Sequence, residues 1–140
     1  MGASKQAETV AVIKLDEASP LPKYLQIVDQ VKALVVADVL RPGAQLPSVR
    51  QLATDLGINV NTVLAAYHAL DAEDVILLRH GSRAAIHPRL AQPTEPRPGD
   101  VARVRAALER TRTDALLLGL SPEALQALVR EIFVGPSASP

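Results

Sequence analysis

Residues 48–63 read SVRQLATDLGINVNTV, and this stretch decides the fold. The pattern predicts two short helices joined by a tight turn. Ser48 is a favoured N-cap, and Gln51 three residues later completes a capping box. Gly57 suits the left-handed position that ends a helix, and Asn59 caps the helix that follows. Two helices with this turn make a helix-turn-helix, which presents the start of its second helix to base edges in a groove of a DNA duplex.

Apolar residues that recur every three or four positions predict the three helices of this domain. A first helix is expected over about 23–40, where Arg41-Pro42-Gly43 ends it. The second helix is expected over about 49–56 and the third over about 60–74. The spacing within the third helix predicts its inward face: Val63, Ala66, Tyr67 and Leu70.

Short apolar segments flank these helices. Residues 75–78 and 84–87 are expected to be two strands of a hairpin around HGSR, which forms a wing. Residues 1–18 are expected to be an N-terminal tail with a short strand over 9–15. The predicted fold class is mainly α with a small β part, and residues 19–87 are expected to form a winged helix-turn-helix domain of the kind that binds DNA.

A different organisation follows this domain. Residues 88–99 contain four prolines and are predicted to be a semi-extended linker. Residues 100–135 are expected to form a two-helix hairpin that starts at Asp100 as N-cap. Its second helix is expected to begin after Ser121, with Pro122 at the favoured first helical position.

The apolar faces of this hairpin predict a partner. Two helices of about 35 residues in total cannot bury both faces against each other and be stable alone. The apolar surface that remains must be covered by another part of the structure. Either the chain's own first domain covers it or a second copy related by a two-fold axis does. We expect the second copy, because the proline-rich linker holds the hairpin away from the first domain. The residues expected to form this dimerisation surface are Val104, Leu108, Leu118, Leu125, Leu128 and Ile132.

Composition limits the classes of function. The 15 basic and 15 acidic side chains balance to a net charge of zero, which argues against a non-specific nucleic-acid binder with a broad basic surface. The chain has no cysteine and its three histidines are not at metal-ligand spacings, so no metal site is expected. Without a phosphate loop or nucleophile motif, neither an enzyme nor a cofactor is expected. No apolar run approaches the length of a membrane span, and we expect a cytoplasmic protein.

The order of these elements resembles the GntR family of bacterial transcription regulators, and more narrowly its YtrA subfamily. The resemblance is carried by SPLPKYLQIVDQVK at 19–32, RPGAQLPSVRQLA at 41–53, NVNTV at 59–63 and LGLSPEALQALVREIF at 118–133. It implies a homodimer that binds operator DNA and usually represses transcription. The tail contains no polar cluster that would mark a pocket for a small-molecule effector.

The resemblance also implies roles for individual residues. Arg50, near the start of the second helix, would contact DNA through a phosphate or a guanine edge. Asn59, Asn61 and Thr62 match the positions where the family's recognition helix enters the major groove. An Asn amide can pair with adenine there, and a Thr methyl group can meet a thymine methyl group.

The wing both matches the family and departs from it. His80 and Gly81 match the wing tip, which in the family reaches the minor groove. Arg83, Ala84 and Ala85 stand where a glycine, a threonine and an aromatic residue are usual. Arg83 is expected to supply positive charge to the minor groove, because narrow grooves attract arginine.

The recognition helix departs from the family as well. Leu64 and Ala65 stand where a basic residue is frequent. This departure and the neutral charge leave open an alternative function, in which the winged helix docks a protein partner through Val60 and Leu64. Lys23, at the start of the first helix, is expected to be solvated, with a phosphate contact as the alternative.

Overall fold

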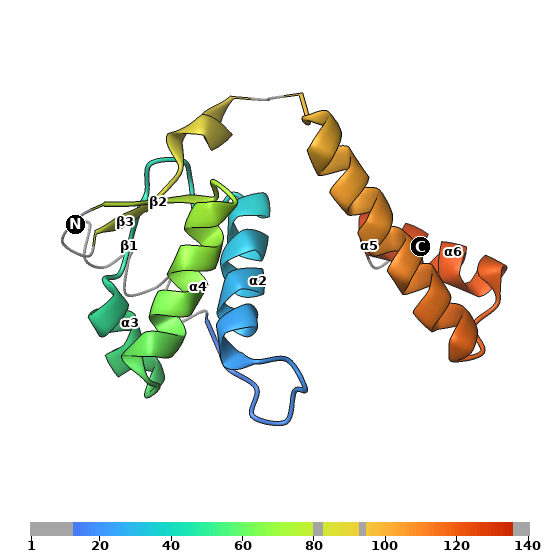
Figure 1. Cartoon of the computed structure of the whole chain (residues 1–140), viewed down its shortest axis with the longest axis horizontal. Helices are drawn as coiled ribbons and strands as arrows, with labels where there is room; N and C mark the ends of the chain where they lie inside the picture. Colours follow the sequence, from blue (N-terminus) through green and yellow to red (C-terminus); the bar gives the residue numbers. More distant parts are fainter. Residues whose placement is uncertain (1–12, 80–82, 93–94, 136–140) are drawn as a thin grey trace, which may run out of the picture. The chain divides into compact units, whose positions relative to one another are not determined.

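The computed structural model describes residues 13–79, 83–92 and 95–135. The chain divides into two compact units, Met1–Thr94 and Glu95–Pro140. The helices of the first unit are α2 (Lys23–Val36), α3 (Val49–Leu56) and α4 (Val60–Ala72). Its strands are β1 (Gln45–Leu46), β2 (Ile76–Leu78) and β3 (Ala84–Ile86). Figure 1 shows α2 and α4 side by side, with α3 beside α4 and the sheet near the C-terminal end of α4.

The core of this unit forms around α4. Its four residues predicted to face inward, Val63, Ala66, Tyr67 and Leu70, are fully buried. They pack in one cluster with Ile27 of α2, Leu52 of α3 and Ile76 of β2, among other apolar side chains. The predicted winged helix-turn-helix and its inward face are therefore confirmed.

The wing is part of a three-stranded antiparallel sheet rather than a lone hairpin. The strand order is β1-β3-β2, and Leu46 lies opposite Ala84 while Ile76 lies opposite Ile86. The predicted pair of strands is present, but β1 was not expected from the sequence. A strand of two residues is too short for an alternating pattern, and only its pairing with β3 defines it.

The first helix ends earlier than predicted. It was expected to reach about residue 40 but ends at Val36. Asp38 adopts a left-handed backbone (φ 61°), which reverses the chain. The amide of Leu40 then donates to the carbonyl of Leu34 (3.1 Å), and its side chain returns to the core. Burial of Leu40 through this turn offsets the loss of one helical turn.

The helix-turn-helix caps form as predicted, with one exception. The Ser48 hydroxyl accepts from the Gln51 amide (3.1 Å), and Gly57 ends α3 with φ 67°. The Asn59 side chain accepts from the Asn61 amide (2.7 Å). The predicted capping box is only half formed, because the Gln51 side chain donates to Asp55 (2.9 Å) instead of returning to Ser48.

The segment before α2 is held by two glutamines. The described part of the predicted strand, residues 13–15, is not a strand, and residues 9–12 lie outside the described residues. The Gln30 side chain accepts from the amide of Lys14 (2.9 Å) and donates to its carbonyl (2.7 Å). Gln26 makes the same pair of bonds with Asp16 (2.8 and 3.1 Å). Side chains of α2 thus take the place of a partner strand.

The predicted linker is shorter than residues 88–99. Pro88–Ala91 forms a 3₁₀-helix, in which Arg89 donates to the carbonyls of Asp74 (2.8 Å) and Glu73 (3.3 Å). Helix α5 begins at Pro98, and Asp100 occupies its third position rather than the N-cap. The Asp100 carboxylate accepts from the amide of Arg97, the residue that precedes the helix (3.3 Å).

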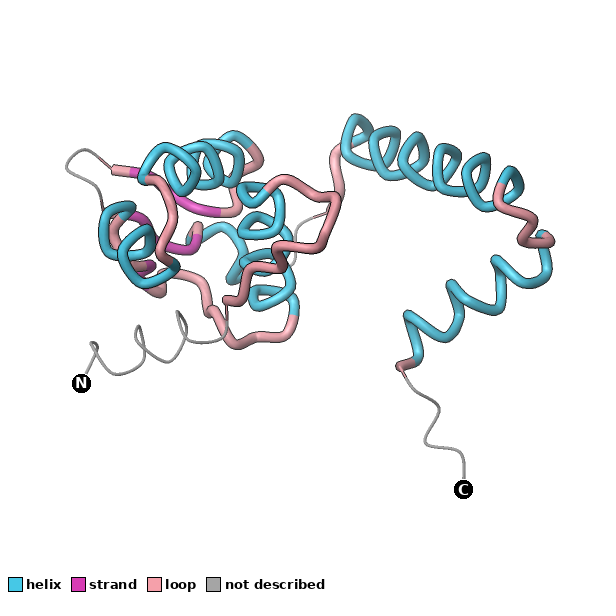
Figure 2. The backbone as a smooth tube through the Cα atoms, turned by 90° about the horizontal axis from the view of Figure 1, so that it is seen from below, coloured by secondary structure: helices cyan, strands magenta, loops and turns pink. Residues whose placement is uncertain are grey.

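The second unit is a helical hairpin of α5 (Pro98–Leu117) and α6 (Pro122–Val134). Gly119 reverses the chain with φ 91°, and the Ser121 hydroxyl caps α6 by accepting from Ala124 (3.0 Å). Figure 2 shows the two helices diverging from their turn. No helix in the described part of the chain is both long and apolar enough to span a membrane.

Candidate nucleic-acid interface

The first turn of α4 presents the residues expected to read bases. Asn59 and Asn61 are exposed and Thr62 is half-buried. The side-chain oxygen of Asn59 is already used as the cap of α4. Among the described residues, none forms a hydrogen bond with the side-chain amide of Asn61. The side-chain amide of Asn61 is therefore available to a base, whereas Asn59 fixes the direction in which the helix starts.

Arg50 lies in the first turn of α3 and is exposed. No residue in the described ranges pairs with its guanidinium group. The start of α3 is fixed by a buried bond, in which the Tyr67 hydroxyl of α4 donates to the carbonyl of Pro47 (2.7 Å). Burial raises the pKa of Tyr67, so this hydroxyl stays protonated and remains a donor. The prediction that Tyr67 is a core residue is confirmed.

The wing is described only at its base. Arg83 is exposed, and its carbonyl accepts from the amide of Arg79 (2.9 Å), which closes the base of the loop. His80 and Gly81 lie outside the described residues. Arg79 follows β2 and Arg83 precedes β3, so these two exposed residues place two positive charges at the base of the wing.

A surface hollow of about 470 Å³ lies between the start of α2 and the first turn of α4. It is lined by Pro22, Lys23, Tyr24, Asn61, Thr62 and Ala65. The Lys23 ammonium group forms an ion pair with Glu17 (3.0 Å), so it is not simply solvated as expected. This hollow could not be predicted from the sequence, because the residues of its two walls are about forty positions apart along the chain.

The residues of the alternative docking surface differ in exposure. Val60 is 42% exposed, whereas Leu64 is half-buried and packs against the core. Only Val60 therefore presents a large apolar surface in the first turn of α4.

The hairpin exposes most of its apolar side chains. Within residues 95–135 only Ala115 is buried, and twelve large apolar side chains are exposed. Of the residues expected in a dimer interface, Leu125 is half-buried, and the exposed ones are Val104, Leu108, Leu118, Leu128 and Ile132. Two antiparallel helices with one buried residue do not have a core of their own.

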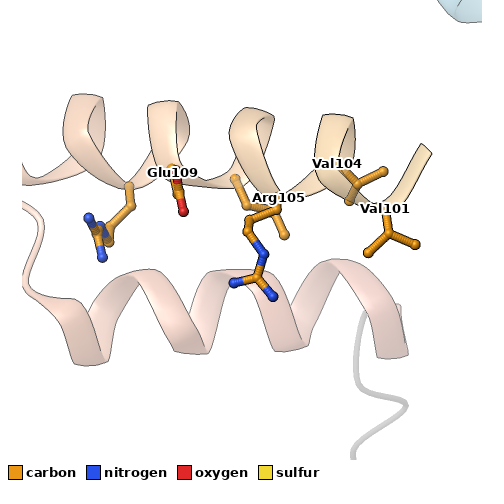
Figure 3. A pocket seen from close by; sticks show the side chains of 6 residues that line it. Val101, Val104, Arg105 and Glu109 are labelled. Atoms are coloured by element: carbon orange, nitrogen blue, oxygen red, sulfur yellow. The ribbon is translucent and has the colours of Figure 1, made fainter. Parts of the chain in front are cut away.

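A hollow of about 440 Å³ runs along the face of α5 that looks toward α6 (Figure 3). It is lined by Val101, Val104, Arg105, Leu108, Glu109 and Arg112. The sequence predicts no polar cluster in the tail that would mark a pocket, whereas three charged residues line this hollow. Arg105, Glu109 and Arg112 follow one another at intervals of four and three residues, which places them on one helical face.

Comparison with known proteins agrees with this architecture. Residues 23–86 match the family of bacterial regulatory proteins named gntR. The chain is 34% identical over 121 residues to the HTH-type transcriptional repressor YtrA of Bacillus subtilis. The aligned residues make up 86% of this chain and 92% of that relative.

Two solved structures are similar over most of the chain. A transcriptional antiterminator from Listeria monocytogenes is 31% identical, with a TM-score of 0.75 over 91% of this chain and 96% of that chain. YtrA from Sulfolobus acidocaldarius, a GntR-family transcription factor, is 33% identical, with a TM-score of 0.59 over 73% of this chain and 98% of that chain. The chain therefore belongs to the GntR family of bacterial regulatory proteins, as a YtrA-like transcription regulator with a DNA-binding winged helix.

Proposed function

We propose that the protein is a homodimeric repressor that binds an inverted-repeat operator. The single observation that carries this proposal is the first turn of α4, where the Asn61 amide is exposed and held by no described residue. An unheld amide at the start of a recognition helix can form two hydrogen bonds with adenine in the major groove. The Asn59 cap sets the direction of that turn by accepting from the backbone amide of Asn61, which leaves the side-chain amide of Asn61 available.

The dimer is supported by the apolar surface of the hairpin. Ile132 is 71% exposed and Phe133 is 84% exposed, both on α6. A contiguous apolar surface of this kind is unfavourable in water and usually marks an association site. A second hairpin related by a two-fold axis would cover it and would set the distance between two winged domains. The repressor role is inferred from the related YtrA of Bacillus subtilis.

The partners that follow are double-stranded DNA and a second copy of the chain. Because a regulator of this family that binds operator DNA must work where that DNA lies, we propose that the protein is located in the cytoplasm.

In vitro selection followed by binding measurements tests this function. The full chain should enrich one duplex sequence from a random pool and bind it with a Kd of about 10⁻⁸ M or tighter at physiological salt. A plot of log affinity against log salt should have a clearly negative slope. A pool without enrichment, together with affinity that does not change with salt, would contradict operator binding.

Substitution of Arg50 tests whether the start of α3 belongs to the interface. Arg50→Ala should weaken binding to the selected duplex by about 1–3 kcal/mol if Arg50 reads a base, with thermal unfolding unchanged. Arg41→Ala is the matched control, because Arg41 is an exposed arginine that follows the C-terminal end of α2, whereas the start of α2 lies beside the first turn of α4. Equal affinities for the two variants would remove Arg50 from the interface.

A protein-docking module is the second candidate, favoured by the exposed Val60 and the absence of lysine and arginine from α4. The same salt series separates the two functions. A docking module would show no preferred duplex and a flat salt response, because no phosphates are neutralised.

A further inference from the structure

The Glu17 carboxylate forms an ion pair with the Lys23 ammonium group, beside the first turn of α4 that is proposed to enter the DNA groove. The distance between Lys23 Nζ and Glu17 Oε1 is 3.0 Å, and the Glu17 side chain is 81% exposed. Lys23 itself lines the hollow that it shares with Asn61 and Thr62. The ion pair therefore lies next to residues expected to touch bases.

The turn that carries Glu17 is fixed to α2 by a buried glutamine. The Gln26 side chain, which is 7% exposed, accepts from the amide of Asp16 and donates to the carbonyls of Asp16 and Leu21. These bonds hold the chain on both sides of Glu17. The carboxylate is thus held near Lys23 by the fold, and its own side chain remains free to turn into solvent.

The dimensions of DNA decide what Lys23 meets when α4 is inserted. An α-helix with its side chains is about 10–12 Å wide, and the major groove is about 12 Å wide. The inserted turn fills the groove, so the residues beside that turn face the phosphates that form the groove walls. Lys23 lies beside the first turn of α4, on the wall of their common hollow. An ammonium group binds phosphate as a point charge.

We propose that Lys23 is a phosphate-binding residue of the interface and that Glu17 competes with the phosphate for it. The proposal rests on the proposed function, because that function puts the first turn of α4 in the major groove. In the free protein the Glu17 carboxylate pairs with Lys23. In the complex a phosphate oxygen replaces it, and Glu17 turns into solvent.

This competition acts on affinity and not on sequence preference. Exposed ion pairs contribute little stability, so a phosphate can displace the carboxylate. Phosphate contacts carry no sequence information. Glu17 therefore weakens binding to every duplex by a similar factor and limits non-specific binding.

Full-length variants with Gln at these two positions test the proposal on the selected duplex and on an unrelated duplex, across a potassium chloride series. Lys23→Gln should weaken binding to both duplexes by a similar factor and make the salt slope shallower by about 0.9. Glu17→Gln should tighten binding to both duplexes by about threefold or more, because a like charge near the phosphates is removed. Lys23→Arg should retain the slope.

The chain offers a matched control at the other end of the same helix. Lys32 is 40% exposed against 41% for Lys23, and it pairs with Glu73 at 2.9 Å. Lys32→Gln removes the same charge and a similar ion pair, but it should leave the salt slope unchanged. In the Lys23→Gln background, Glu17→Gln should give less than half of its gain in affinity.

Three results would overturn the proposal. Equal affinities and slopes for Lys23→Gln and Lys32→Gln, in a protein that binds its operator, would remove Lys23 from the interface and leave the proposed function intact. An undiminished effect of Glu17→Gln in the Lys23→Gln background would exclude the competition. Failure of the unsubstituted chain to prefer any duplex would end both this proposal and the proposed function.

Discussion

The hydroxyl group of Tyr67 links the buried core to the start of α3, which belongs to the candidate interface. Its ring is fully buried in α4, and its hydroxyl donates to the carbonyl of Pro47, two residues before Val49 begins α3. This bond satisfies a buried carbonyl and fixes the point at which α3 starts. Because Arg50 is the second residue of α3, this bond also fixes where Arg50 lies.

Tyr67→Phe removes the donor and keeps the ring. The Pro47 carbonyl would be left without its buried partner, so we expect the free energy of unfolding to fall by about 1–3 kcal/mol. Urea denaturation measures this change. Tyr24→Phe is the control, because Tyr24 is only half-buried and its hydroxyl makes no hydrogen bond with the described residues. Equal stabilities of Tyr67→Phe and the unsubstituted chain would show that the hydroxyl has no structural role.

At the scale of elements, two glutamines of α2 replace a partner strand. Gln26 and Gln30 are one helical turn apart, and each pairs with the amide and carbonyl of one residue in the segment before α2. They differ in burial, because Gln26 is buried and Gln30 is half-buried. The same hydrogen bonds therefore have different consequences for stability.

Substitution by methionine, which has a similar shape and no amide, separates the two. Gln26→Met should lower the free energy of unfolding by about 1–3 kcal/mol, because it removes the three hydrogen bonds of a buried side chain and leaves part-buried backbone groups unpaired. Gln30→Met should cost less than about 1 kcal/mol, since water can replace its bonds. Urea denaturation of both variants gives the comparison. Losses of equal size would mean that burial of Gln26 does not determine the effect.

The helix-turn-helix was predictable because its signals are local. Ser48, Gly57 and Asn59 each act on a backbone group within three residues, and the structure places all three where the sequence indicated. The period of α4 likewise predicted its buried face, because one helical face packs against the core.

Elements defined by distant contacts could not be predicted in this way. Strand β1 exists through its pairing with β3, about forty residues later. Arg89 holds the 3₁₀-helix through the backbone carbonyls of Glu73 and Asp74, which any residue type would present. The hollow beside Lys23 likewise joins residues from two helices.

At the scale of the whole molecule, the two units differ in how much of their apolar surface they bury. The winged unit has a continuous buried core and an exposed recognition turn. The hairpin unit has almost no core and a large exposed apolar surface. We propose that the first unit contacts DNA and that the second unit pairs two copies of the chain. Paired hairpins would then bring two recognition turns to one operator.

Hydroxyl-radical footprinting on the selected operator shows whether two recognition turns bind it together. The chain cut after Arg97 is the comparison, because it keeps all the described elements of the winged unit and lacks α5 and α6. The full chain should protect two half-sites on one face of the duplex, with centres about 10 base pairs or a multiple of that apart. The shortened chain should be a folded monomer that protects neither half-site at the same concentration. Protection of a single half-site by the full chain, or an identical two-site footprint from the shortened chain, would show that paired hairpins do not bring two recognition turns to the operator.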